Sequence, residues 1–115
     1  MLTVWNRTRG SLMGSRIRVA DTFLTRIRGL LFTERLGSGE GLWILPCNSI
    51  HSFGMGFTFD ALFLGPDGKV VGRYDRFRRN RISRVFWNAR GVLELPAGTI
   101  ERTGTEVGDE IRFET

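Results

Sequence analysis

The chain contains few of the residues that covalent crosslinks, metal centres and membrane spans require. Its 115 residues include one cysteine and one histidine, which excludes an internal disulfide framework and a structural zinc site built from cysteine and histidine. No apolar run is long enough for a transmembrane helix, and the first residues contain no signal-peptide core. We therefore expect a cytoplasmic protein without a membrane partner.

The remaining composition is that of an ordinary globular protein. Hydrophobic residues make up 41% of the chain and charged residues 25%, and fifteen glycines stand against three prolines. This balance favours a packed core with many tight turns over disorder. Because the length is close to the commonest domain size, we predict one domain over residues 1–115.

The positive charge is concentrated in one segment. Residues 73–90 carry seven arginines and one aspartate, and Tyr74 and Phe77 lie among them. Arginines with interleaved aromatic residues can hold phosphates and stack on bases. Such runs are also typical of solvated surfaces. Nucleic-acid binding is therefore our third hypothesis, and we do not expect nucleic acid to be the partner.

Seven short stretches have the β-branched or alternating pattern of strands. They are residues 2–5, 15–21, 42–45, 61–64, 69–74, 91–96 and 109–114. In the second stretch, Ile17 and Val19 are expected to face one way, and Arg16 and Arg18 the other. The turn sequence at 65–68, with Gly68 in its last position, predicts a β-hairpin between the fourth and fifth stretches.

One segment, residues 21–32, changes to a helical period. Its apolar residues recur at spacings of three and four, and Asp21 is placed to cap the first turn. The predicted fold is therefore mainly β, a small barrel-like or two-sheet sandwich of short strands with one short helix.

The chemically interesting residues lie in the stretch 44–64. Cys47 and His51 are four residues apart and precede Met55 and Asp60. On a strand, His51 and Met55 would share one face, but the glycines between them indicate a bulge or break. Asp60 stands in an otherwise apolar run, where an unpaired carboxylate is costly. We therefore predict that Asp60 is buried and accepts hydrogen bonds.

Four interpretations of this stretch remain open. Cysteine, histidine and methionine at this spacing are similar to blue-copper ligands, but those sites need a second histidine, so we predict no metal and no cofactor. Cys47 could be a nucleophile with His51 as its base and Asp60 or Glu94 as the orienting acid, which would make a hydrolase-like enzyme. A polar pocket for a small molecule or peptide would use His51, Asp60, Glu94 and Arg28.

In the fourth interpretation these side chains serve packing alone. Cys47 would then be a small hydrophobic residue, Arg28 would cap a helix end, and Glu94 would face solvent at a sheet edge.

Three blocks of the chain resemble a known family. They are "RIRGLLF" at 26–32, "LPCNSIHSFGMGFTFDALFLGPDGKVV" at 45–71 and "VLELPAGTIERTGTEVGDEIRF" at 92–113. In this order they are similar to domain-of-unknown-function family 192, a bacterial and archaeal group. The resemblance implies a compact β-rich domain with a short helix and no established activity, cofactor or substrate. The family pattern matches at all six candidate residues, Arg28, Cys47, His51, Met55, Asp60 and Glu94.

The sequence thus predicts a binding module for a small molecule or peptide, with a polar pocket near His51 and Asp60. An enzyme that uses Cys47 and His51 is the alternative.

Overall fold

The computed structural model describes residues 1–29 and 35–115. These residues form seven strands and two short helices. In chain order the elements are β1 (Leu2–Asn6), β2 (Ser11–Ala20), α1 (Phe23–Arg28), β3 (Glu40–Ile44), β4 (Phe59–Leu64), β5 (Val70–Phe77), β6 (Gly91–Pro96), α2 (Thr99–Thr103) and β7 (Ile111–Glu114).

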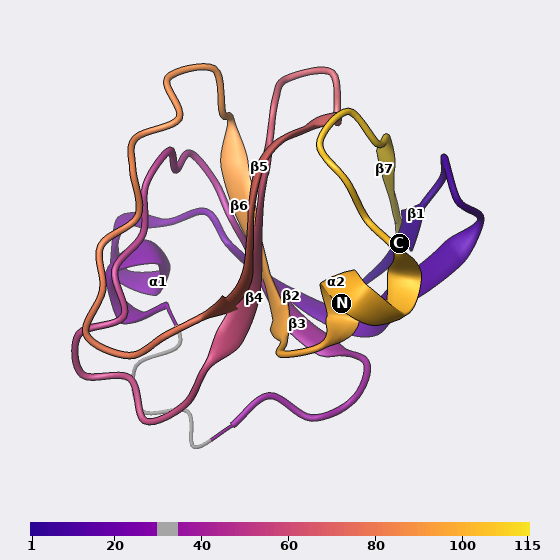
Figure 1. Cartoon of the computed structure of the whole chain (residues 1–115). Coiled ribbons are helices and arrows are strands. Elements are labelled where there is room, and N and C mark those ends of the chain that lie inside the picture. The colour runs from indigo at the N-terminus through magenta and orange to yellow at the C-terminus, as the bar shows by residue number, and fades with distance from the viewer. Residues whose placement is uncertain (30–34) are drawn as a thin grey trace.

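All the strands that are described belong to one sheet, in the order β5-β4-β6-β3-β2-β1-β7. Neighbouring strands are antiparallel except for β2 and β3, which are parallel and are connected through α1. The sheet curls into a half-barrel (Figure 1). This confirms the prediction of a mainly β, barrel-like fold. No helix in the described ranges is long and apolar enough to cross a membrane.

The predicted hairpin is present between β4 and β5. The N–H of Gly65 donates to the carbonyl of Lys69 at 2.9 Å, and Gly68 adopts a φ of 80°, which favours glycine. The tip of this hairpin also binds the segment that leads into β7, because the N–H of Ile111 donates to the carbonyl of Gly68 at 2.9 Å. The two edges of the sheet therefore approach each other at that end.

The predicted helix is shorter than its pattern and differs in its cap. Thr22, not Asp21, is the N-cap: its hydroxyl accepts from the N–H of Thr25 at 3.2 Å, and the Thr25 hydroxyl accepts from the N–H of Thr22 at 3.0 Å. Because threonine stands at both positions, the two residues form a reciprocal capping box. A cap at Asp21 would not form this pair of hydrogen bonds. The helix ends at Arg28, and the rest of the predicted segment, from residue 30, lies outside the described residues.

Two details of the elements were not visible in the sequence. Val19 is exposed although Ile17 is buried, and β1 begins with Leu2 opposite Ile17, so that this strand does not extend to Val19. The helix α2 was not predicted, since five residues are too few for a helical period to be visible.

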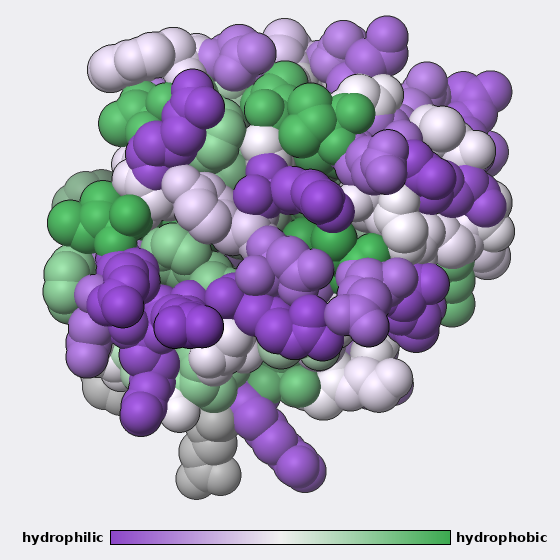
Figure 2. Space-filling view, viewed as in Figure 1, coloured by the Kyte–Doolittle hydropathy of each residue, from purple (hydrophilic) through white to green (hydrophobic). Residues whose placement is uncertain are grey.

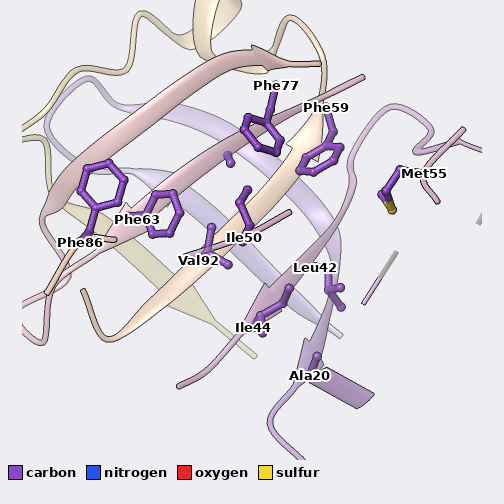
Figure 3. Packing of buried hydrophobic residues seen from close by; sticks show 11 residues of the cluster. Ala20, Leu42, Ile44, Ile50, Met55, Phe59, Phe63, Phe77, Phe86 and Val92 are labelled. Atoms are coloured by element: carbon purple, nitrogen blue, oxygen red, sulfur yellow. The ribbon is translucent and has the colours of Figure 1, made fainter. Parts of the chain in front are cut away.

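The core lies on both faces of the central strands. Every residue of β4 is buried, and its side chains alternate between two hydrophobic clusters. One cluster contains Leu62 and Leu64 and packs inside the curl of the sheet with Ile100 of α2. The other contains Phe59 and Phe63 together with Ile50, Met55 and Phe86 from outside the strands (Figure 3). In that cluster Phe63 stacks on Phe86 with ring centroids 4.4 Å apart.

Candidate functional site

Three segments pack together at one end of the half-barrel, and we call this region the loop end. It consists of residues 22–29 with α1, residues 45–58 and residues 78–90, which lie on the left in Figure 1. The Nη1 of Arg26 in α1 donates a hydrogen bond to the carbonyl of Pro46 at 3.3 Å. The two long loops are joined by backbone hydrogen bonds, from Ser52 N–H to Arg81 at 2.9 Å and from Phe86 N–H to Asn48 at 2.8 Å.

A cavity of about 170 Å³ lies between these segments and the sheet. Its walls come from α1 and Gly29, from residues 46–55, and from Ile44 and Glu94 of the sheet. We call it the Glu94 cavity. Among the sequence-predicted site residues, it brings together Arg28, Cys47, His51, Met55 and Glu94.

Asp60 is not part of this cavity. Its carboxylate is buried and accepts hydrogen bonds from the backbone N–H groups of Arg76 at 2.9 Å and Ile100 at 2.8 Å. This confirms that Asp60 is buried and bonded. Burial raises the pKa of Asp60, and the two N–H donors act in the opposite direction. The residue therefore connects β4 to β5 and to the start of α2.

Glu94 is the most unusual polar residue of the cavity. It lies on β6, between its register partners Leu42 on β3 and Ala61 on β4, and only 4% of it is exposed. The interpretation of Glu94 as an edge residue facing solvent was therefore wrong. Among the described residues no group donates a hydrogen bond to its carboxyl, and burial raises its pKa to about 8. At neutral pH this carboxyl is mainly protonated and can both donate and accept.

Arg26 also lines this cavity, and within the described ranges it carries a polar atom without a partner. Its Nε is buried and has no hydrogen-bond partner among the residues described. Sequence reasoning selected Arg28 from the same block and missed Arg26. The pattern could not distinguish the two, because both arginines lie in the last turn of α1.

Cys47 is held as a neutral thiol. Its Sγ donates to the carbonyl oxygen of Ser49 at 3.1 Å, and burial raises the pKa of the thiol. The thiolate is the nucleophilic form of cysteine, so this environment disfavours nucleophilic attack by Cys47.

His51 and Met55 lie at different depths. His51 is exposed at the rim, and its ring stacks on Phe53 with centroids 6.0 Å apart. Met55 is buried in the loop-side cluster. Phe53 lies not in the cavity but in a neighbouring hollow that it shares with His51 and Ile82. Within the described ranges, no group of three histidine, cysteine or acidic residues is arranged to hold a metal ion.

Over the described residues, the fold defines a small β protein with one curled sheet, two short helices and a small cavity under its loops. The chain belongs to domain-of-unknown-function family 192, described as an uncharacterized ACR, whose model matches residues 4–113. This confirms the resemblance found in the sequence.

Relatives support the same assignment. A UPF0127 protein of Thermococcus sibiricus is 35% identical over 95% of this chain and 73% of its own length. A UPF0127 protein of Pyrococcus horikoshii is 30% identical over 96% of this chain and 97% of its own length. A crystal structure of a protein of unknown function from Novosphingobium aromaticivorans has a TM-score of 0.82 at 24% identity, covering 96% of this chain and 82% of that one. This likeness shows the fold alone.

Proposed function

We propose that the protein is a binding module whose Glu94 cavity takes a small polar molecule or one polar group of a peptide. One observation carries the proposal: the Nε of Arg26 is buried without a hydrogen-bond partner among the described residues, and Arg26 lines the same cavity as Glu94, whose side chain is also buried. A buried polar group without a partner costs about 1–3 kcal/mol. A ligand that satisfies both groups recovers that cost.

The volume limits the ligand. A cavity of about 150 Å³ can hold a molecule of the size of benzene, and the Glu94 cavity measures about 170 Å³. The bound group therefore has about six non-hydrogen atoms. Any larger ligand must extend past His51 at the rim.

The wall chemistry indicates which functional groups the ligand carries. Arg26 Nε is a donor and requires a carbonyl or carboxylate oxygen. Glu94 accepts from an ammonium, amide or hydroxyl group, and an ammonium also stabilises the ionised carboxylate that burial disfavours. A ligand with an amine or amide at one end and a carboxyl or carbonyl group at the other, as in an amino acid or peptide, fits both walls.

Amide chemical-shift mapping by NMR tests this proposal. The probes are 3-aminopropanoate, which carries both groups, and propylamine and propanoate, which carry one each. We expect 3-aminopropanoate to shift the amides of Cys47, His51 and Glu94 at lower concentration than either single-function probe. A Glu94→Leu variant should lose this response, while an Asp21→Leu variant, altered at an exposed position outside the cavity, should keep it. Shifts that are equal for all probes, or unchanged in Glu94→Leu, contradict the proposal.

The hydrolase-like alternative has weaker support. Cys47 and His51 both line the cavity, but the thiol is neutral and engaged with Ser49. The alternative requires a thiolate at neutral pH, which is a measurable property.

A further inference from the structure

The loop end is strongly and uniformly basic. Its three segments, residues 22–29, 45–58 and 78–90, contain seven arginines and neither aspartate nor glutamate. These are Arg26, Arg28, Arg78, Arg79, Arg81, Arg84 and Arg90, and all but Arg26 are exposed. The packing of the segments against one another therefore collects seven of the seventeen basic residues, and no acidic residue, at one end of the half-barrel.

The same segments expose large apolar side chains. Seven such residues stand in solvent: Phe23, Leu24, Ile27, Phe53, Ile82, Val85 and Trp87. Trp87 is 85% exposed, Leu24 76% and Ile82 69%. In the space-filling view, hydrophobic residues alternate with hydrophilic ones on this side of the molecule (Figure 2). A monomeric protein in water does not benefit from several protruding apolar residues at one place.

From this combination we infer that the loop end binds the surface of an anionic lipid bilayer. The exposed apolar side chains insert among the headgroups, and the surrounding arginines pair with lipid phosphates and carboxylates. Arginine suits this position because its aliphatic stem lies along apolar surface while the guanidinium stays at the polar boundary. The interaction is peripheral and needs no membrane-spanning segment. It departs from the expectation of no membrane partner, which rested on the lack of such a segment in the sequence.

The shape and chemistry of the patch favour lipid over other anionic partners. Single-stranded nucleic acid binds through aromatic platforms on which bases stack, whereas four of the seven exposed apolar residues here are aliphatic, and only three are aromatic. An acidic peptide is usually held in a groove or at a sheet edge, whereas these side chains project from a helix and two loops. A bilayer accepts projecting side chains without a complementary pocket.

Co-sedimentation of the full chain with vesicles tests the inference. We expect binding to vesicles of phosphatidylcholine with phosphatidylserine, little binding to phosphatidylcholine alone, and release as salt is raised. The Arg78→Gln, Arg79→Gln double variant should weaken the partition by about tenfold or more. The matched control is Arg7→Gln with Arg112→Gln, which removes the same charge near β1 and β7, on the right in Figure 1, and should bind almost as the wild type does.

A second pair of measurements addresses the apolar residues. Ile82→Ser with Trp87→Ser should also reduce binding to anionic vesicles, and because both side chains are exposed, thermal unfolding should stay close to that of the wild type. The wild type should show a blue-shifted tryptophan emission on vesicles that is lost in Trp87→Phe. Equal binding to neutral vesicles, an equal loss in the Arg7 and Arg112 control, or tighter binding to a single-stranded oligonucleotide at the same salt overturns the inference.

Discussion

The carboxylate of Asp60 on β4 accepts a hydrogen bond from the backbone N–H of Ile100, 2.8 Å away and 40 residues later in the chain. Its other oxygen accepts from the N–H of Arg76 at 2.9 Å, where β5 passes through a positive φ of 59°. One side chain thereby satisfies two backbone donors, on β5 and on α2.

Replacing Asp60 should therefore destabilise the fold. We expect Asp60→Ala to lower the free energy of unfolding by roughly 2–4 kcal/mol, because two N–H groups lose their acceptor. Equilibrium unfolding in urea measures the change. The exposed Asp21→Ala serves as the control, with an expected effect below about 0.5 kcal/mol. Equal stabilities of the two variants would show that Asp60 contributes little.

Glu94 should make the stability depend on pH. Its folded-state pKa of about 8 lies above its ordinary value of 4.5, so the folded state favours the neutral carboxyl. The contribution of Glu94 to the free energy of unfolding is fully present below about pH 4.5 and is lost as the pH rises through about 8. The full loss is on the order of 4–5 kcal/mol, from about 1.4 kcal/mol for each unit of pKa.

The comparison that isolates this effect is the wild type against Glu94→Gln. The difference in unfolding free energy between them should move in favour of Glu94→Gln as the pH rises from about 5 to 9. An exposed Glu101→Gln variant should follow the wild-type profile. A pH-independent difference between wild type and Glu94→Gln is the outcome that contradicts a protonated Glu94.

Cys47 should react slowly in the native protein. Its thiol is partly buried and donates to Ser49, and its raised pKa leaves little thiolate at neutral pH. Iodoacetamide labelling followed by mass spectrometry should show slow modification in buffer and fast modification in urea. Rapid labelling at about pH 6 that disappears in His51→Ala would instead favour the hydrolase-like alternative.

Gly72 on β5 should not tolerate a side chain. A Cβ at this position would lie 2.1 Å from a ring carbon of Phe86, which stacks on Phe63. We expect Gly72→Ala to destabilise by about 1–3 kcal/mol through overpacking. Gly56→Ala is the matched control, because nothing lies within 4 Å of the added carbon. Thermal unfolding midpoints of the two variants measure the difference. Equal midpoints would mean that the Phe86 ring moves aside without a cost in stability.

The basic segment should bind nucleic acid only weakly. We expect a Kd no tighter than ~10 µM at physiological salt, within the range of non-specific binding. Fluorescence anisotropy with a labelled single-stranded oligonucleotide measures this affinity. A sub-micromolar complex that weakens steeply with salt would restore nucleic acid as the leading partner.

Local patterns in the sequence were sufficient for much of the fold. The hairpin at Gly65 to Gly68 follows from turn chemistry, and the apolar run around Asp60 correctly indicated a buried, bonded carboxylate. These features depend on residues close in the chain, whose spacing reports strand geometry and burial directly. The family assignment likewise rested on motifs that are visible in the sequence.

Long-range packing decided the rest. The helical period over residues 21–32 indicated a helix, but it could not show that the packing of α1 leaves Phe23 and Leu24 exposed. The sequence left open that Glu94 faces solvent at a sheet edge, because alternation along one strand does not reveal that β6 lies between β4 and β3. The meeting of Arg26, Cys47 and Glu94 at one cavity depends on a parallel crossover and two long loops. Sequence spacing alone could propose such a meeting but not specify it, because the contacts join residues far apart in the chain.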